Sequence, residues 1–306
     1  MKHIKMLAVL ATLLVVQGCV SMAQHTPITQ AKKDQIKTLY VYNLVSQDEV
    51  RPAVELSNVS GALGGGLIGA MIDASINDDR ANEARAALDT FYSNSLDMDY
   101  RQIQQEAFSP MLAEHFPLAA DGAAVKTVVL TDKEVEQRAA KLGPNEGFLF
   151  LTSHYTFVES FKTLQTGMAA FLFVGGNAKP KVSKPDFHNV YVYQSPVIGS
   201  GGEDSISQWS VDKASTFREQ IKQSIAFGVN AMKYDLQMPV TESCSIAASF
   251  NLPGQLGVQK VTGILVEQTE ERALIRAKDG RLYQVDPKRI STTTNKNCKD
   301  GSVTNA

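Results

Sequence analysis

The sequence predicts an α+β fold, in which a mixed sheet is packed with helices and is followed by a small all-β barrel-like module. Between residues 36 and 238, segments that alternate apolar and polar residues are interspersed with segments whose apolar residues recur every three or four positions. From residue 239 to residue 306 the helical spacing disappears, and short strands separated by turn residues remain. We therefore expect an α/β domain over 36–238 and a β module over 239–306.

The α/β domain is expected to begin with a strand at 36–44, IKTLYVYNL, because this segment alternates and is rich in β-branched and aromatic residues. Apolar residues at helical spacing predict a helix over 100–115, which Pro110 is expected to kink. Asp212 is expected to cap the start of another helix. The remaining expected features are a strand at 125–130, a helix at 132–142, a strand at 189–198, and one apolar helix face formed by Phe217, Ile221, Ile225, Gly228 and Met232.

Two unusually apolar runs, 147–158 and 164–174, lie on either side of a short polar stretch. Strands that are apolar on both faces are typical of a sheet whose two faces are both covered. The two runs therefore predict an antiparallel hairpin near the middle of the sheet.

The β module contains three short strand patterns, at 257–267, 273–277 and 282–285. Asp279-Gly280 lies between the last two patterns and predicts a tight hairpin turn with positive φ. A module of this size has a marginal core of its own. An additional covalent or packing restraint is therefore expected.

Residues 1–18 have the order of a secretory signal peptide. Two lysines provide a basic start, residues 6–16 are apolar, and the small residue Gly18 precedes Cys19. The apolar stretch is shorter than the about 20 residues that a membrane-spanning helix needs. We therefore expect this segment to be removed during export.

The tetrapeptide VQGC at 16–19 resembles the lipobox of bacterial lipoproteins. The resemblance implies that Cys19 is lipidated, becomes the mature N-terminus, and makes membrane lipid a partner. Val20 stands where an aspartate commonly retains such proteins at the inner membrane, so the resemblance implies the periplasmic face of the outer membrane. Residues 19–35 are polar and lack periodicity, which predicts a flexible tether that holds the body about 20–25 Å from the lipid.

Cys244 and Cys298 are the two cysteines that remain when Cys19 is set aside, and they border the β module. In an oxidising compartment an even pair predicts a disulfide bond. Closing a loop of that length stabilises a fold by up to about 4 kcal/mol on the chain-entropy model. The disulfide is the expected restraint on the module.

The segment 58–77, NVSGALGGGLIGAMIDASIN, carries small residues at four-residue spacing. Such spacing lets helix backbones approach closely, in membranes above all. Three alternatives stay open for it: a buried helix, a membrane-touching or self-associating glycine zipper, and a mobile loop. GGGLIG also matches GxGxxG formally, but the strand–helix context of dinucleotide binding is missing, so no cofactor is expected. The positions expected to pack closely or to touch a membrane are Gly61, Gly65, Gly66 and Gly69.

The sequence contains no HExxH, nucleophile elbow, Walker loop or CxxC pair. Asp186 and His188 share a strand face and are expected to be a solvated pair. Ser210 and Lys213 have the SxxK spacing of serine acylases but lack the companion motifs, so Ser210 and Asp212 are expected to serve helix capping instead. The histidines outside the signal peptide are His25, His115, His154 and His188. We expect no catalytic residue, no metal site and no enzymatic activity.

The formal net charge of −2 argues against a nucleic-acid partner. The β module has a local group of basic side chains that could contact anionic lipid or glycan, but three glutamates dilute it, so an ordinary solvated face is expected. These residues are Arg272, Arg276, Lys278, Arg281, Lys288 and Arg289, with Glu267, Glu270 and Glu271.

The order of elements over about 36–236, following a lipobox, is similar to the α/β domain of the curli-secretion lipoprotein and of the N-terminal domain of the Tol translocation protein. The GGGLIGAxID-like segment at 64–73 resembles uncharacterised lipoproteins. These resemblances imply a role in envelope assembly or export.

The expected function is a non-enzymatic interaction or assembly role in the cell envelope, with an unknown envelope protein or a second copy of the chain as partner. One alternative is an oligomeric export or pore component that inserts the hairpin 147–174 or the glycine-rich segment into the outer membrane. A second alternative is a periplasmic hydrolase, which would need the scattered histidine and serine side chains to converge in a cleft.

Overall fold

The computed structural model describes residues 25–47, 51–52, 89–95, 98–237, 246–254 and 257–293. Several expected features lie outside these residues. They are the signal peptide 1–18, the lipidation site Cys19, the pair Cys244 and Cys298, and the glycine-rich segment with Gly61, Gly65, Gly66 and Gly69.

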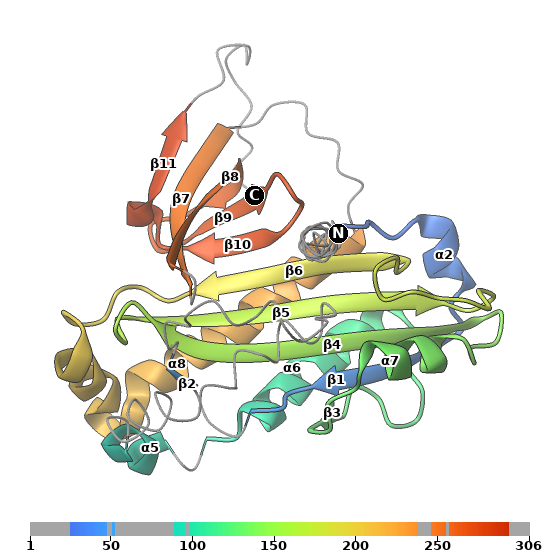
Figure 1. Ribbon diagram of the computed structural model, residues 1–306, viewed down its shortest axis with the longest axis horizontal. Helices are drawn as coiled ribbons and strands as arrows, with labels where there is room; N and C mark the ends of the chain where they lie inside the picture. The colour runs from blue at the N-terminus through green and yellow to red at the C-terminus, as the bar shows by residue number, and fades with distance from the viewer. Residues whose placement is uncertain are drawn as a thin grey trace, which may run out of the picture.

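The described strands form one mixed, 11-stranded sheet packed with helices, which agrees with the expected combination of sheet and helices (Figure 1). Its order is β11-β7-β8-β9-β10-β6-β5-β4-β1-β3, and β2 pairs with β4. The strands are β1 Thr38–Leu44, β2 Arg51–Pro52, β3 Val125–Lys126, β4 Glu146–Val158, β5 Thr163–Val174, β6 Phe187–Gln194, β7 Ile246–Gly254, β8 Gly257–Gln268, β9 Ala273–Ala277, β10 Leu282–Val285 and β11 Ile290–Thr293.

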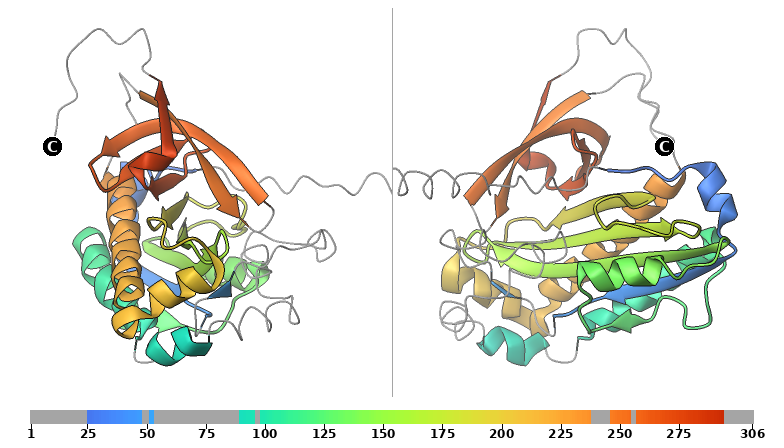
Figure 2. Two further views of the ribbon diagram at one scale, coloured as in Figure 1. Left: turned by 90° about the vertical axis from the view of Figure 1, so that its left-hand side faces the viewer. Right: turned by 45° about the vertical axis from the view of Figure 1, so that its right-hand side comes forward.

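Helices cover both faces of the sheet (Figure 2). They are α2 Gln30–Gln35, α5 Asp89–Ser95, α6 Tyr100–His115, α7 Asp132–Ala139, α8 Gly202–Gln237 and the 3-10 turn η2 Pro287–Arg289. Helices α5, α6 and α8 enclose the main core, which includes Phe91, Phe108 and Trp209. Helix α7 packs on the opposite face through Val135 and Ala139.

The hairpin expected near the middle of the sheet is confirmed. β4 and β5 pair antiparallel over their whole length, and β1 and β6 flank them. Side chains of β4 alternate between the two cores, with Leu149 and Leu151 on the α8 side and Phe148 and Phe150 on the α7 side. A central position with two buried faces explains why the sequence of these strands is apolar without interruption. Moving the hairpin into a bilayer would require breaking the ladders on both sides.

The C-terminal strands do not form a closed barrel, which corrects the barrel-like part of the expected fold. Within the described residues, the series β11-β7-β8-β9-β10 stays open and joins the main sheet where β10 pairs parallel with β6 (Figure 1). These strands do have a core of their own, which includes Phe250, Ile275 and Tyr283. Sequence alternation identifies strands but not their partners, so the free edge of β6 was not recognisable as the site where β10 pairs.

Two glycines shape the C-terminal strands. The expected β9–β10 hairpin is present, and the backbone N–H of Ala277 donates to the carbonyl of Arg281 across its turn; within Asp279-Gly280 only Gly280 has the expected positive φ, +89°. Gly263 of β8 lies so close to β9 that a Cβ atom would stand 2.1 Å from the carbonyl oxygen of Arg276. The absence of a side chain at Gly263 therefore lets β8 approach β9.

Helix α8 starts ten residues earlier than expected. It begins at Gly202 and is interrupted at 211–214, where Asp212 has φ +49° and ψ +52°. A capping residue normally has extended backbone, so Asp212 marks a break between two helical parts. The face that was expected after it is confirmed, since Phe217, Ile221 and Ile225 are buried.

The part of the expected tether that begins at His25 packs on the body. Thr26 forms an antiparallel bridge with His188 at the edge of β6, and the N–H of His25 donates to the carbonyl of Asp279. Thr29 caps α2, whose Lys32 forms an ion pair with Asp186. The polar composition of 25–35 suggested a free chain, but backbone hydrogen bonds at His25 and Thr26 and the ion pair of Lys32 attach this segment to the folded part.

Candidate functional site

A groove of about 500 Å³ lies between α8 and the C-terminal strands, beside the end of β6. Its volume lies within the range of about 300–1,000 Å³ that is common for ligand pockets. Its lining comprises Tyr193 and Gln194 at the end of β6 and Pro196 after it; Gln220, Gln223, Ala226, Phe227 and Asn230 from α8; and Glu270, Glu271, Arg272, Gln284, Val285, Asp286 and Lys288 from the C-terminal strands and their connections. The union of β10 with β6 creates this groove.

The groove is rich in side-chain amides. Each amide offers two donors and one acceptor, so together they suit a ligand with many hydrogen-bonding groups. Gln194 is only 2% exposed; its Nε2 donates to Oε1 of Gln165 at 3.1 Å, while its Oε1 accepts no hydrogen bond within the described part of the chain. A buried acceptor without a partner is costly. This oxygen is shielded from solvent, so it is a cost within the fold and not a contact point for a ligand in the groove.

Tyr193 organises the α8 side of the groove. Its hydroxyl lies 2.5 Å from Oε1 of Gln220 and 3.2 Å from Oε1 of Gln223, and its single proton is donated to the nearer oxygen, that of Gln220. Burial raises the pKa of Tyr193 well above its ordinary value, so the phenol stays protonated and keeps donating. Gln220 is thereby oriented before any ligand arrives.

The rim of the groove carries charges of both signs. Arg272 pairs with Glu267 at 3.2 Å, and both side chains are about half exposed. Asp286 accepts from the backbone N–H of Lys288 at 2.9 Å and caps η2. Such a rim favours a polar partner without selecting for strong net charge.

A buried polar junction lies near the C-terminal end of α8, where this helix meets β6 and β9. The guanidinium of Arg276 donates to Oδ1 of Asp235 at 2.6 Å, and the two side chains are only 6% and 1% exposed. Oδ2 of Asp235 accepts from Asn189 and from the hydroxyl of Tyr191. Arg276 also donates to the carbonyl of Gly280 at 3.0 Å. The junction therefore links α8, β6 and the β9–β10 hairpin.

The N-terminal segment closes this junction. A Cβ atom on Gly280 would stand 2.1 Å from Cβ of His25, so the histidine packs directly on the hairpin turn. Burial lowers the pKa of His25, while Asp235 raises it and Arg276 lowers it further. Burial, and next the carboxylate of Asp235, hold the pKa of Tyr191 well above its ordinary value. His25 is thus held neutral, and Tyr191 remains a donor.

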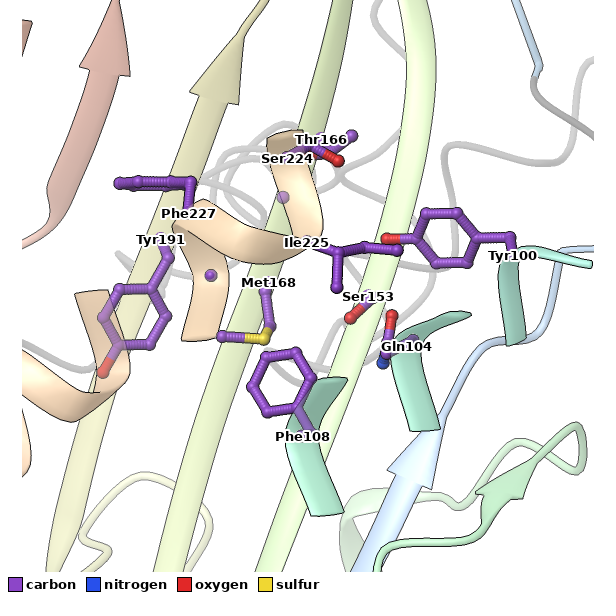
Figure 3. Close-up of a pocket in the computed structure, with 12 residues that line it drawn as sticks. Tyr100, Gln104, Phe108, Ser153, Thr166, Met168, Tyr191, Ser224, Ile225 and Phe227 are labelled. Carbon is purple, nitrogen blue, oxygen red and sulfur yellow. The ribbon is translucent and has the colours of Figure 1, made fainter. Parts of the chain in front are cut away.

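A second, much smaller cavity of about 10 Å³ lies between α6, α8 and the central strands (Figure 3). Polar side chains, among them Gln104, Ser153 and Ser224, face it together with Phe108 and Met168. Its volume matches a single water molecule. This cavity is part of the core and is too small for a ligand.

The structure separates the residues that sequence analysis had considered for catalysis. His154 is enclosed beside Gly167 in the central hairpin, and burial lowers its pKa. Ser210 donates to the carbonyl of Ile206 at 2.7 Å, and Lys213 is exposed in the break of α8. The described side chains of these residues therefore form no nucleophile and base pair.

Two expectations about charged residues were wrong. His188 is not solvated but 2% exposed, with its ring centroid 4.6 Å from that of Phe171, while Asp186 pairs with Lys32. The basic residues of the β module do not form one solvated face, because Arg276 is buried in the junction and Arg289 pairs with Glu159 at 3.0 Å.

Sequence reasoning missed both the junction and the groove. One signal was present for Asp235, because it continues the spacing of the buried face after Gly228 and Met232, which marks it as an acid on an apolar face. No comparable local signal marked Asn189 or Gln194, whose partners lie on other elements.

Within the described residues, no three His, Cys, Asp or Glu side chains are grouped as ligands for a metal ion. Among the described helices, none is both long enough and apolar enough to cross a membrane. Comparison of the chain with protein-family models, with curated proteins and with solved structures gave no match.

The junction predicts that replacing Arg276 in β9 lowers the stability of the fold much more than replacing Arg272, which lies just before β9. Arg276→Met leaves the carboxylate of Asp235 buried without its cation, and we expect a loss of about 3–5 kcal/mol in the free energy of unfolding. Arg272→Met removes an exposed ion pair and should lower the free energy of unfolding by at most about 1 kcal/mol. Urea denaturation followed by the fluorescence of Trp209 measures both.

A further variant separates the charge from the packing. Adding Asp235→Leu to Arg276→Met removes the uncompensated charge, so the double variant should be more stable than Arg276→Met alone. Equal stability of the Arg276 and Arg272 variants would contradict the proposed importance of the junction.

Proposed function

We propose that this protein is a lipid-anchored, non-enzymatic lipoprotein on the periplasmic face of the outer membrane, and that it binds an envelope partner through the groove beside α8. The single observation that carries the anchoring is Cys19 directly after a basic, then apolar, then small-residue sequence. The observation that supports partner binding is the groove of about 500 Å³, which is rich in side-chain amides.

The arrangement of the groove favours an extended, polar partner. Amides from both α8 and β10 face the same space, so a chain lying in the groove would meet donors and acceptors on either side. Peptide segments and glycan strands of envelope components both have this character. The mixed charges of the rim fit such a neutral, hydrogen-bonding chain.

We also propose that Cys244 and Cys298 form a disulfide. Support comes from the pairing of β7 with β11, in which Ala247 is the partner of Thr293. Cys244 precedes Ala247 by three residues and Cys298 follows Thr293 by five, so the cysteines extend from two strand ends that lie together. A disulfide would stabilise the outermost strands of the sheet.

Replacing Cys19 tests the anchor. In the native host, Cys19→Ala should abolish labelling with palmitate and release the protein from the membrane fraction, because the thiol that accepts the lipid is missing. Cys244→Ser, which leaves the lipobox intact, is the matched control and should remain labelled. Persistent labelling of the Cys19→Ala protein would contradict lipidation at this residue.

Photo-crosslinking in intact cells tests the groove. A photoreactive amino acid at Ala226 or at Asn230, both of which are exposed in the groove, should give a defined adduct, because a bound partner lies against these positions. The same group at Lys133, exposed on α7 on the other face of the sheet, should not give this adduct.

A groove-filling variant provides the second control. Ala226→Trp should suppress the adduct formed from position 230, since the indole would occupy the space of the partner. An identical adduct from Lys133, or one that survives Ala226→Trp, would contradict binding in the groove.

A further inference from the structure

The attachment of His25 to the body leaves only a short link to the lipid. His25 is six positions after Cys19, and six extended residues span at most about 20–22 Å. A flexible link of this length averages about 12–15 Å between its ends. The end of the body that holds His25 therefore stays close to the membrane to which Cys19 would be attached.

Three segments meet at this end of the molecule. The N-terminal segment 25–37 contacts the loop 175–186, because Gln35 donates to the carbonyl of Gly175 and Lys32 pairs with Asp186. It also contacts the loop 278–281 through the hydrogen bond from His25 to Asp279. We call these three segments the basic end.

The basic end has a charge opposite to that of the whole chain. It contains seven lysines, one arginine and three aspartates, whereas the protein has a formal net charge of −2. Two of the aspartates are engaged in ion pairs, Asp186 with Lys32 and Asp279 with Arg281. A nearby acid outside these segments, Glu136 of α7, pairs with Lys181.

Four lysines of the basic end remain available. Lys37, Lys179, Lys184 and Lys278 are exposed and form no ion pair with any residue that the structure describes. Lysines near a membrane surface are attracted to anionic headgroups over about a Debye length, which is about 8–10 Å at physiological ionic strength. The short link, about 12–15 Å on average, lets these four lysines come within the range in which that attraction acts.

We propose that the basic end docks on the anionic phospholipid headgroups of the leaflet that holds the lipid of Cys19. This proposal rests on the lipid anchor proposed above and adds an orientation to it. The groove includes Tyr193 and Gln194 at the end of β6, whereas Thr26 pairs with His188 near its start. These positions are about 20 Å apart along the strand. Docking through the basic end thus leaves the groove facing away from the membrane.

The test uses the full lipidated protein reconstituted in vesicles of phosphatidylcholine alone or of phosphatidylcholine with phosphatidylglycerol. An amine-reactive reagent labels the lysines, and mass spectrometry gives the labelling rate at each one. On anionic vesicles, Lys179, Lys184 and Lys278 should react about fivefold more slowly than on neutral vesicles, and high salt should abolish the difference. Lys213 and Lys222 are exposed on α8 and lie before its C-terminal end, which is the end nearest to His25. They should react at the same rate on neutral and on anionic vesicles.

Charge reversal provides the matched variants. With Lys179→Glu, Lys184→Glu and Lys278→Glu together, Lys37 should lose its protection on anionic vesicles. Lys213→Glu with Lys222→Glu, which changes the charge away from the basic end, should leave that protection intact. Equal protection of Lys213 and Lys179, or no dependence on anionic lipid, would overturn the docking.

The same mass-spectrometry experiment tests the lipid anchor separately from the docking orientation that rests on it. The mass of the N-terminal peptide shows whether Cys19 carries a diacylglycerol. An unmodified peptide would contradict the anchor, whereas a lipidated peptide with uniformly reactive lysines would contradict only the orientation.

Discussion

The ion pair between Asp235 and Arg276 is the constraint on which the arrangement of this protein depends. Removing two charges from water is costly, and the cost is offset only when both partners and their further hydrogen bonds are in place. Here the carboxylate comes from the long helix, the guanidinium from β9, and the remaining donors, Asn189 and Tyr191, from β6. An arrangement that misplaced any one of these elements would leave a buried charge without its partner. The pair is formed in the arrangement in which β10 joins β6, and a free C-terminal module would leave Asp235 without Arg276.

Two functional features follow from that union. The groove exists because the C-terminal strands stand beside α8 at a fixed separation, and its amides face each other only in this arrangement. The same junction also receives His25, whose backbone donates to the hairpin turn of β9 and β10. A segment expected to be a loose tether is thereby fixed, and the route from the body to the proposed lipid becomes short. Ligand binding and orientation at the membrane would both depend on one buried contact.

The sequence predicted elements well where local pattern determines structure. The central hairpin, α6 and β1 were recognised because burial on one or both faces dictates the spacing of apolar residues. Pairing between strands that are far apart in the chain leaves no comparable pattern in the sequence. For this reason β10 was assigned to a separate barrel-like module, although it pairs with β6. Arg276 was read as a surface cation because nothing local distinguishes a buried arginine from an exposed one. The amide-rich groove likewise combines residues far apart in the chain, so neither it nor Gln194 could be foreseen.

The most direct test asks whether the C-terminal strands unfold together with the rest of the sheet. Hydrogen exchange followed by mass spectrometry over a series of denaturant concentrations compares peptides from β4 and β5 with peptides from β9 and β10. One continuous sheet, held by the pair of Asp235 and Arg276, predicts that both regions lose protection at the same denaturant concentration. Loss of protection in β9 and β10 at clearly lower denaturant, while β4 and β5 stay protected, would contradict a single cooperative unit.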